Sequence, residues 1–169
     1  EVSSVDALFF NLAKHYNLLN YNLNPNEVAR ILRETYMQCE EKRPLSFFQA
    51  EYEEVIQRYQ IRNVQQYLRV NRAGQGEALN PAMRTKLWDF FDLFLRRKEE
   101  ARVIDFDDLA FLIIQAVKDQ RIAPMFDSVV IDEAQDLSVV KLKALQVLVR
   151  QSKNNIFILS DQNQRIFKL

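Results

Sequence analysis

A change of hydrophobic period near residue 128 constrains the fold of this 169-residue chain more than any other feature. Residues 128–131 and 156–159 are short apolar runs rich in β-branched side chains, and residues 138 to about 151 between them have the spacing of an amphipathic helix. Strand, helix and strand within about 30 residues are typical of a βαβ unit, in which a crossover helix joins two parallel strands. Neither apolar run alternates with polar residues, so we expect both faces of this sheet to be covered. The C-terminal third therefore predicts an α/β fold.

The residues before this unit have helical patterns. Asn24-Pro25 and Asn80-Pro81 each place a capping side chain directly before a proline, which is a signal for the start of a helix. Residues 105–119 begin with three acids and continue with mostly apolar side chains, which indicates a buried helix with its acids at the N-terminal end. We expect residues 1–104 to form a mainly helical subdomain and residues 105–169 to form part of a parallel α/β core.

Composition restricts the chemistry that the chain can perform. With His15 and Cys39 as the single histidine and cysteine, it cannot build a His/Cys zinc site or a complete nucleophile triad, except with His15 as the sole base. A lone cysteine fits a reducing compartment, so we expect a cytoplasmic location. No run of 18 apolar residues exists, so we expect no membrane partner. Metal chemistry would have to use carboxylates.

The glycine count is also informative. Gly74 and Gly76 are the two glycines, and no G-x-x-x-x-G-K-[ST] pattern occurs. The chain therefore lacks a Walker A loop, which cradles nucleotide phosphates with its backbone amides and lysine.

Polar side chains follow both predicted strands. The string D-E-A-Q-D occupies residues 132–136, and S-D-Q-N-Q occupies residues 160–164. Ligands bind beyond the carboxyl ends of parallel strands, so we expect these two strings to converge on one edge. There, one carboxylate can hold Mg²⁺, a second can accept a proton from an attacking water, and an amide can contact a terminal phosphate. The pattern favours a magnesium–nucleotide site over polar loops without a ligand.

Residues 129–136 resemble motif II of the UvrD/Rep-like superfamily 1 DNA helicases, and residues 159–167 resemble their motif III. Residues 104–109 are similar to the acidic element that follows the helical insertion of this family, and residues 4–9 lie where the family has a T-x-H-x-F-like element. The resemblance implies a fragment of the first RecA-like domain, with a partial RecA-like parallel βαβ core and a large all-α helical insertion.

The resemblance also implies roles for individual residues. Asp132 corresponds to the Mg²⁺ residue, and Glu133, beside it at the metal, corresponds to the base that activates water. Gln164 corresponds to the catalytic sensor of the γ-phosphate, and Gln135, Asp136 and Asp161 are further residues of the nucleotide site. The implied cofactors are ATP and Mg²⁺, and the implied function is ATP-driven translocation on DNA and its unwinding, as in DNA repair.

Two residues depart from the family pattern, since Ser160 stands where glycine is usual and Asp6 where histidine is usual. The Walker A loop and the second motor domain are not among these residues, and phosphoryl transfer depends almost entirely on the charges they supply. We therefore expect this fragment alone to be inactive and to need the remaining helicase domains of the parent chain.

A locally basic segment suggests where DNA could bind. Lys plus Arg equals Asp plus Glu at 23 each, yet the segment from Arg58 to Lys86 holds six basic residues against one acid. Arginines neutralise phosphates, and interleaved tyrosines offer stacking surfaces. The candidate contacts to single-stranded or junction DNA are Arg62, Arg69, Arg72, Arg84 and, in the N-terminal element, Ser4. An ordinary solvated helix face explains the same pattern equally well.

Two other functions remain open from sequence alone. One is a non-catalytic DNA- or protein-interaction module derived from a helicase, which the absent Walker A loop also fits. The other is an unrelated Mg²⁺-dependent phosphotransfer enzyme, which would need a phosphate cradle that two glycines do not favour.

Overall fold

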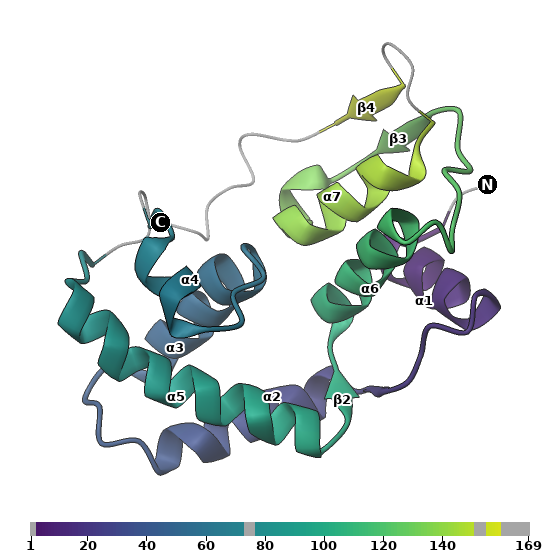
Figure 1. Cartoon of the computed structure of the whole chain (residues 1–169). Coiled ribbons are helices and arrows are strands. Elements are labelled where there is room, and N and C mark those ends of the chain that lie inside the picture. The colour runs from purple at the N-terminus through teal and green to yellow at the C-terminus, as the bar shows by residue number, and fades with distance from the viewer. Residues whose placement is uncertain (1–2, 73–76, 151–154, 160–169) are drawn as a thin grey trace. The chain divides into compact units, whose positions relative to one another are not determined.

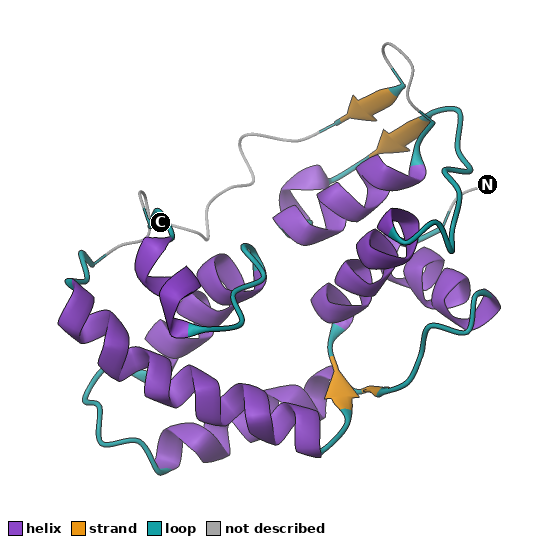
Figure 2. Ribbon diagram, viewed as in Figure 1, coloured by secondary structure: helices purple, strands orange, loops and turns teal. Residues whose placement is uncertain are grey.

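The computed structural model describes residues 3–72, 77–150 and 155–159. It is a mostly helical α/β structure with two small parallel sheets of two strands each (Figures 1 and 2). The chain forms two compact units, one of Glu1–Leu19 with Phe106–Leu169 and the other of Asn20–Asp105. None of the described helices combines the length and the apolar character needed to cross a lipid bilayer.

The first unit contains the predicted βαβ arrangement. Its elements are α1 (Val5–His15), α6 (Phe106–Lys118), β3 (Val129–Ile131), the 3₁₀ turn η2 (Ala134–Asp136), α7 (Val139–Leu148) and β4 (Ile156–Ile158). Strands β3 and β4 are parallel, with Val129 opposite Ile156 and Ile131 opposite Ile158. The prediction of two parallel strands joined by a helix is therefore confirmed.

The β3–β4 sheet is covered on one face. Helix α7 lies against that face, and an apolar pocket of about 350 Å³ remains between the helix and the strands. Val130 and Phe157 are paired across the ladder and are 67% and 53% exposed. The expectation that both faces are covered is therefore wrong for the part of the chain that the structure describes.

The second unit is built around aromatic side chains. Its elements are β1 (Asn22–Leu23), α2 (Pro25–Met37), α3 (Leu45–Glu51), the π-helix η1 (Tyr52–Gln57), α4 (Val64–Arg69), α5 (Pro81–Glu100) and β2 (Val103–Ile104). The predicted caps are confirmed: Glu27 N donates to Asn24 Oδ1 at 3.1 Å, and Met83 N donates to Asn80 Oδ1 at 2.9 Å. Phe48 is fully buried, and its ring centroid lies 4.3 Å from that of Phe90.

Short strands join the two ends of this unit. Strands β1 and β2 are parallel, with Asn22 opposite Val103 and Leu23 opposite Ile104. Arg102 Nη2 adds a hydrogen bond to Asn20 O at 3.1 Å. The segments through which the chain enters and leaves the second unit are therefore held side by side.

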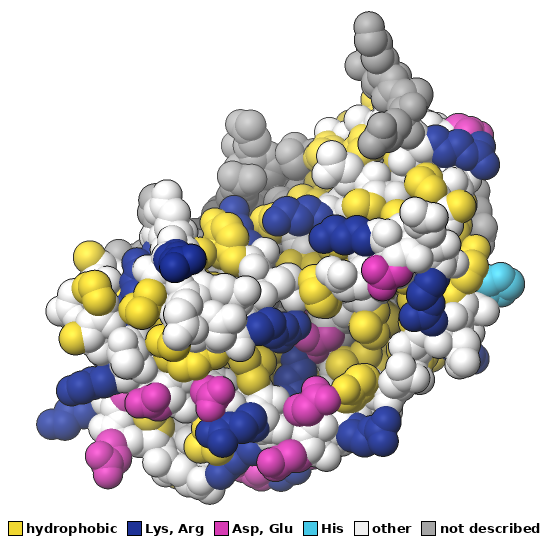
Figure 3. Space-filling view, in the orientation of Figure 1, with side chains coloured by type: hydrophobic (Ala, Val, Ile, Leu, Met, Phe, Trp, Pro, Cys, Tyr) yellow, Lys and Arg dark blue, Asp and Glu magenta, His cyan; other side chains and the backbone are white. Residues whose placement is uncertain are grey.

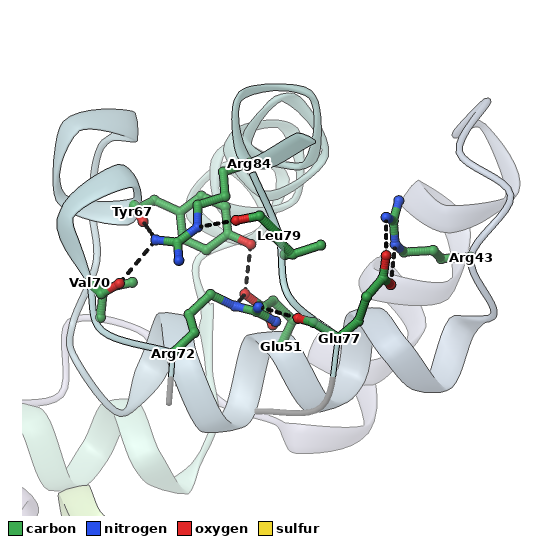
Figure 4. Close-up of polar contacts among 8 residues, drawn as sticks. All are labelled: Arg43, Glu51, Tyr67, Val70, Arg72, Glu77, Leu79 and Arg84. Carbon is green, nitrogen blue, oxygen red and sulfur yellow. Dashed lines mark hydrogen bonds and ion pairs between the residues drawn. The ribbon is translucent and has the colours of Figure 1, made fainter. Parts of the chain in front are cut away.

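A buried ion pair lies inside the second unit (Figure 4). The side chains of Arg72 and Glu51 are 5% and 3% exposed, and Arg72 Nε donates to Glu51 Oε1 at 2.7 Å. Tyr67 Oη donates to the same oxygen at 2.6 Å, and Arg72 Nη1 donates to Glu77 O at 2.8 Å. Burial alone would lower the pKa of the Arg72 guanidinium, but its hydrogen bonds to Glu51 and the charge of Glu51 outweigh burial and raise that pKa. Arg72 is therefore a structural cation.

This pair predicts a large stability difference between two similar substitutions. Glu51→Gln leaves the Arg72 guanidinium buried without its counter-charge, so we expect the free energy of unfolding to fall by about 3–5 kcal/mol. Glu34→Gln removes the same charge from an exposed pair with Arg30 and should cost less than about 1 kcal/mol. Urea denaturation followed by the fluorescence of Trp88, the single tryptophan and a member of the same core, measures both. Equal losses in the two variants would contradict a structural role for the pair.

Candidate functional site

The residues after β3 form a tight loop that leads into α7 (Figure 1). Asp136 N donates to Glu133 O at 3.0 Å, and Leu137 N donates to Ala134 O at 3.2 Å. Ser138 then caps α7, because its Oγ accepts a hydrogen bond from the backbone N–H of Lys141. We call residues 132–138 the acidic loop.

The acidic loop is fastened to the end of the neighbouring strand. Leu159 N donates to Ile131 O at 2.8 Å, and Ala134 N donates back to Leu159 O at 3.2 Å. The carboxyl ends of β3 and β4 therefore share one edge, as expected for parallel strands. The acidic loop occupies that edge.

Part of the predicted site lies outside the described residues. Ser160, Asp161 and Gln164 belong to this part. The expected convergence of Gln164 with Asp132 and Glu133 therefore stays a prediction.

Glu133 has an unusual backbone conformation. Its φ and ψ angles are 51° and 39°, in the left-handed helical region. The other described non-glycine residues with positive φ follow the ends of helices, where a left-handed residue commonly closes the last turn; they are Asn17, Gln60, Arg102 and Gln120. Glu133 instead lies between a strand and a 3₁₀ turn, where this conformation costs about 1–2 kcal/mol. Its N–H donates to Asp132 Oδ1 at 3.0 Å, so the Asp132 carboxylate helps to hold the turn.

The oxygens of the acidic loop suit a hard divalent cation. Asp132 and Glu133 are both exposed, and Gln135 Nε2 donates a hydrogen bond to Glu133 Oε2. Gln135 Oε1 is buried and has no hydrogen-bond partner among the described residues. No group of three or more His, Cys, Asp or Glu side chains with metal-binding geometry occurs in the described part of the chain. Carboxylate oxygens are ligands that Mg²⁺ uses, commonly one or two at a time, with water and phosphate oxygens completing its shell.

The C-terminal end of the acidic loop and the first turn of α7 are held by contacts that the sequence did not predict. Ser138 Oγ donates to Asp107 Oδ1 on α6 at 2.8 Å. Lys141 Nζ lies 2.7 Å from Asp6 Oδ1 on α1 and 5.5 Å from the centroid of the Phe106 ring. Asp6 on α1 is thus an ion-pair partner of α7. The sequence predicted acids at the N-terminal end of α6, but no local pattern indicates these tertiary contacts.

The candidate DNA contacts have different environments. Arg62 and Arg69 are exposed just before α4 and in its last turn. Arg72 is held by Glu51, and Arg84 Nη1 donates to the backbone carbonyls of Tyr67 and Val70 at the C-terminal end of α4 (Figure 4). The same nitrogen also donates to Leu68 O. Ser4 lies in the first unit, where it caps α1 by accepting from Ala7 N at 3.2 Å. Arg72 and Arg84 therefore have structural contacts, whereas Arg62 and Arg69 lie at the surface.

The visible charges on helices α2 and α5 are mixed. On the face shown in Figure 3, Lys and Arg side chains are interspersed with Asp and Glu side chains over these helices.

Three curated relatives share part of the chain, and all are ATP-dependent helicase/nuclease subunits A. The protein from Lactiplantibacillus plantarum is 28% identical over 88 residues, which are 47% of this chain and 7% of the relative. The protein from Oceanobacillus iheyensis is 30% identical over 94 residues, and that from Clostridium botulinum is 28% identical over 95; in both cases the match covers 47% of this chain and 8% of the relative. The matched region therefore spans less than a tenth of these relatives.

The family model described as the UvrD/REP helicase N-terminal domain matches residues 5–169. This match includes the acidic loop, both strands of the β3–β4 sheet and the whole helical second unit. The chain belongs to the UvrD/REP helicase family.

Proposed function

We propose that this chain is a portion of the first motor domain of an ATP-dependent DNA helicase, in which the acidic loop binds the metal and activates the attacking water. In this proposal Asn20–Asp105 is the helical insertion, and the first unit is part of a RecA-like core. The whole protein would use ATP to move along DNA and unwind it, in line with the family and with the helicase subunits that share this region.

The observation that carries the proposal is the position of two adjacent carboxylates at the end of a parallel strand pair. Asp132 and Glu133 follow β3 at the edge where ligands of parallel sheets bind. The left-handed backbone of Glu133 supports the proposal further, because strained residues that the surrounding structure holds in place are found at functional sites.

The residues of the acidic loop would have different roles in binding the metal and activating water. Asp132 would hold Mg²⁺ directly or through water, and the bound ion would neutralise charge on the triphosphate. Glu133, held by Gln135, would accept a proton from the attacking water. Gln135 and Asp136 would support the site, and Asp161 and Gln164 would contact the nucleotide from the end of the second strand.

The first unit has the surface of an incomplete parallel sheet. Strands of such sheets are ordinarily covered on both faces, yet Val130 and Phe157 are more than half exposed. In our proposal other segments of the full-length protein cover this face and supply the phosphate cradle. Their charges are required, because positioned cations provide most of the catalysis of phosphoryl transfer.

Glu133→Gln in the full-length protein tests the catalytic proposal. The amide keeps the size of the side chain but cannot act as a base, so we expect ATP turnover to fall by about 10²–10⁴-fold. The dissociation constant for Mg-ATP, measured by calorimetry, should change by less than about threefold, since binding does not need this proton transfer. The matched control is Glu100→Gln, an exposed glutamate at the end of α5. Substantial turnover in Glu133→Gln would remove Glu133 from the role of base, whereas absence of turnover in the wild-type full-length protein would favour a non-catalytic module.

We also propose that the surface around α4 contacts DNA phosphates. Arg62 and Arg69 are exposed there, and Tyr59 nearby in sequence is 46% exposed with the Arg58 guanidinium 5.6 Å from its ring centroid. Exposed arginines and aromatic faces are the groups that bind single-stranded nucleic acid without sequence preference. Because Arg72 and Arg84 hold the fold of this region, their role would be to support the surface.

The arginine surface predicts a specific salt dependence. Replacing both Arg62 and Arg69 with alanine in the full-length protein should weaken DNA binding and reduce the slope of log K against log salt by about 1.4, the loss of two contacts to single-strand phosphates. Fluorescence anisotropy with labelled single-stranded DNA at several salt concentrations measures the slope. Arg33→Ala, at an exposed arginine of α2, is the control and should leave it unchanged. An unchanged slope in the double variant would place the phosphate contacts elsewhere.

A further inference from the structure

We propose that residues 105–107 couple the helical second unit to the acidic loop through the chain itself. Asp105 is held by buried side chains of the second unit, and Asp107 holds the end of the acidic loop in the first unit. The biological consequence of this coupling rests on the proposed function, whereas the coupling itself is a property of the fold.

Asp105 is fixed by three side chains of the second unit. Gln57 Nε2 donates to both carboxylate oxygens, at 2.9 and 2.8 Å, and Tyr52 Oη donates to Oδ2 at 3.2 Å. Lys98 Nζ donates to Tyr52 Oη at 2.5 Å and lies 3.4 Å from Asp105 Oδ2. All three donor residues are less than 10% exposed, so these charge-assisted hydrogen bonds are shielded from water.

The π-helix explains how two of these donors reach one carboxylate. Tyr52 and Gln57 are the first and last residues of η1 and lie five positions apart. In a π-helix the backbone hydrogen bonds join residues five apart, so side chains at this separation lie on nearly the same side. Such turns are rare, and they occur frequently at functional sites.

The two following residues are fixed in the first unit. The Phe106 ring lies under Lys141 Nζ of α7, and Lys141 is itself paired with Asp6. Asp107 accepts the hydrogen bond of Ser138, the last residue of the acidic loop. A shift of the N-terminal turn of α6 therefore acts directly on the point where the loop enters α7.

The link between β2 and α6 is a single residue. Strand β2 ends at Ile104 and α6 begins at Phe106, so Asp105 is the single residue between two regular elements. The Cα atoms of Asp105 and Asp107 can be at most about 7 Å apart, because two residues span no more than that. The other crossing between the units, residues 16–21, separates α1 from β1 by six residues. In our proposal, a displacement of the buried cluster around Asp105 therefore moves Asp107, and with it Ser138.

Under the proposed function, this connection lets DNA binding at the second unit affect the ATP site. A ligand that displaces the second unit would change the position of the Ser138 end of the acidic loop, and with it the orientation of Glu133. Asp105 and Asp107 are positioning residues in this account.

Hydrogen exchange in the full-length protein tests the coupling without relying on ATP hydrolysis. In Asp105→Asn we expect the peptide that covers the acidic loop to exchange about tenfold faster than in the wild type, the effect of weakening one hydrogen-bonded charge. Tyr52→Phe removes one hydroxyl, keeps all charges and should accelerate the same peptide in the same direction. Asp92→Asn, at a partly exposed residue of α5 that pairs with Arg96, is the matched control and should leave it unchanged.

A double-mutant cycle completes the test. Asp107→Asn should also accelerate exchange of the acidic loop, and the variant with both Asp105→Asn and Asp107→Asn should be no faster than the faster single variant, since both act on one connection. Unchanged loop exchange in Asp105→Asn and Tyr52→Phe, or effects that simply add, would overturn the proposal. If the wild-type full-length protein hydrolysed no ATP, the proposed function would fail, while the exchange data would still decide the coupling.

Discussion

Two backbone hydrogen bonds beyond the end of the β3–β4 ladder hold the candidate site together. One joins Leu159 N to Ile131 O, and the other joins Ala134 N to Leu159 O. The first continues the parallel pairing past Ile158, the last residue of β4, and the second joins the acidic loop to that strand. Because of them the loop begins at a fixed point, and the left-handed turn at Glu133 is held in place by its surroundings. The positions of both carboxylates depend on this pairing.

The two units bury their side chains to different extents. The second unit has a continuous aromatic core and a shielded ion pair between Glu51 and Arg72, so these two buried charges stabilise its own fold. The first unit leaves apolar strand residues exposed and keeps its carboxylates at the surface. Under the proposed function, this contrast is the one expected between a helical insertion with its own core and part of a motor domain. Within the second unit, some arginines hold the fold, as Arg84 does, and others are exposed, as Arg69 is.

Much of the local structure follows from the sequence, because it depends on neighbouring residues. The caps at Asn24 and Asn80, the helix after Asp105 and the βαβ order were all predicted, since each has a signal within a few positions. The contacts made by Asp107 with Ser138 and by Asp6 with Lys141 had no such signal, because they join residues 31 or more positions apart. Sequence patterns grouped residues 1–19 with the helical segment that follows, whereas in the structure they lie in the unit of α6 and α7; an apolar helix face does not specify its partner. A basic segment likewise cannot distinguish a buried arginine such as Arg72 from an exposed one such as Arg62.

We propose that the acidic loop is the metal-binding edge of an ATP site. A crystal structure of the full-length protein with Mg²⁺ and a non-hydrolysable ATP analogue tests it most directly. We expect an Asp132 carboxylate oxygen at about 2.1 Å from the ion or joined to it through one water, with the Glu133 carboxylate facing the water nearest the terminal phosphate. A triphosphate and metal bound away from the ends of β3 and β4 would contradict it.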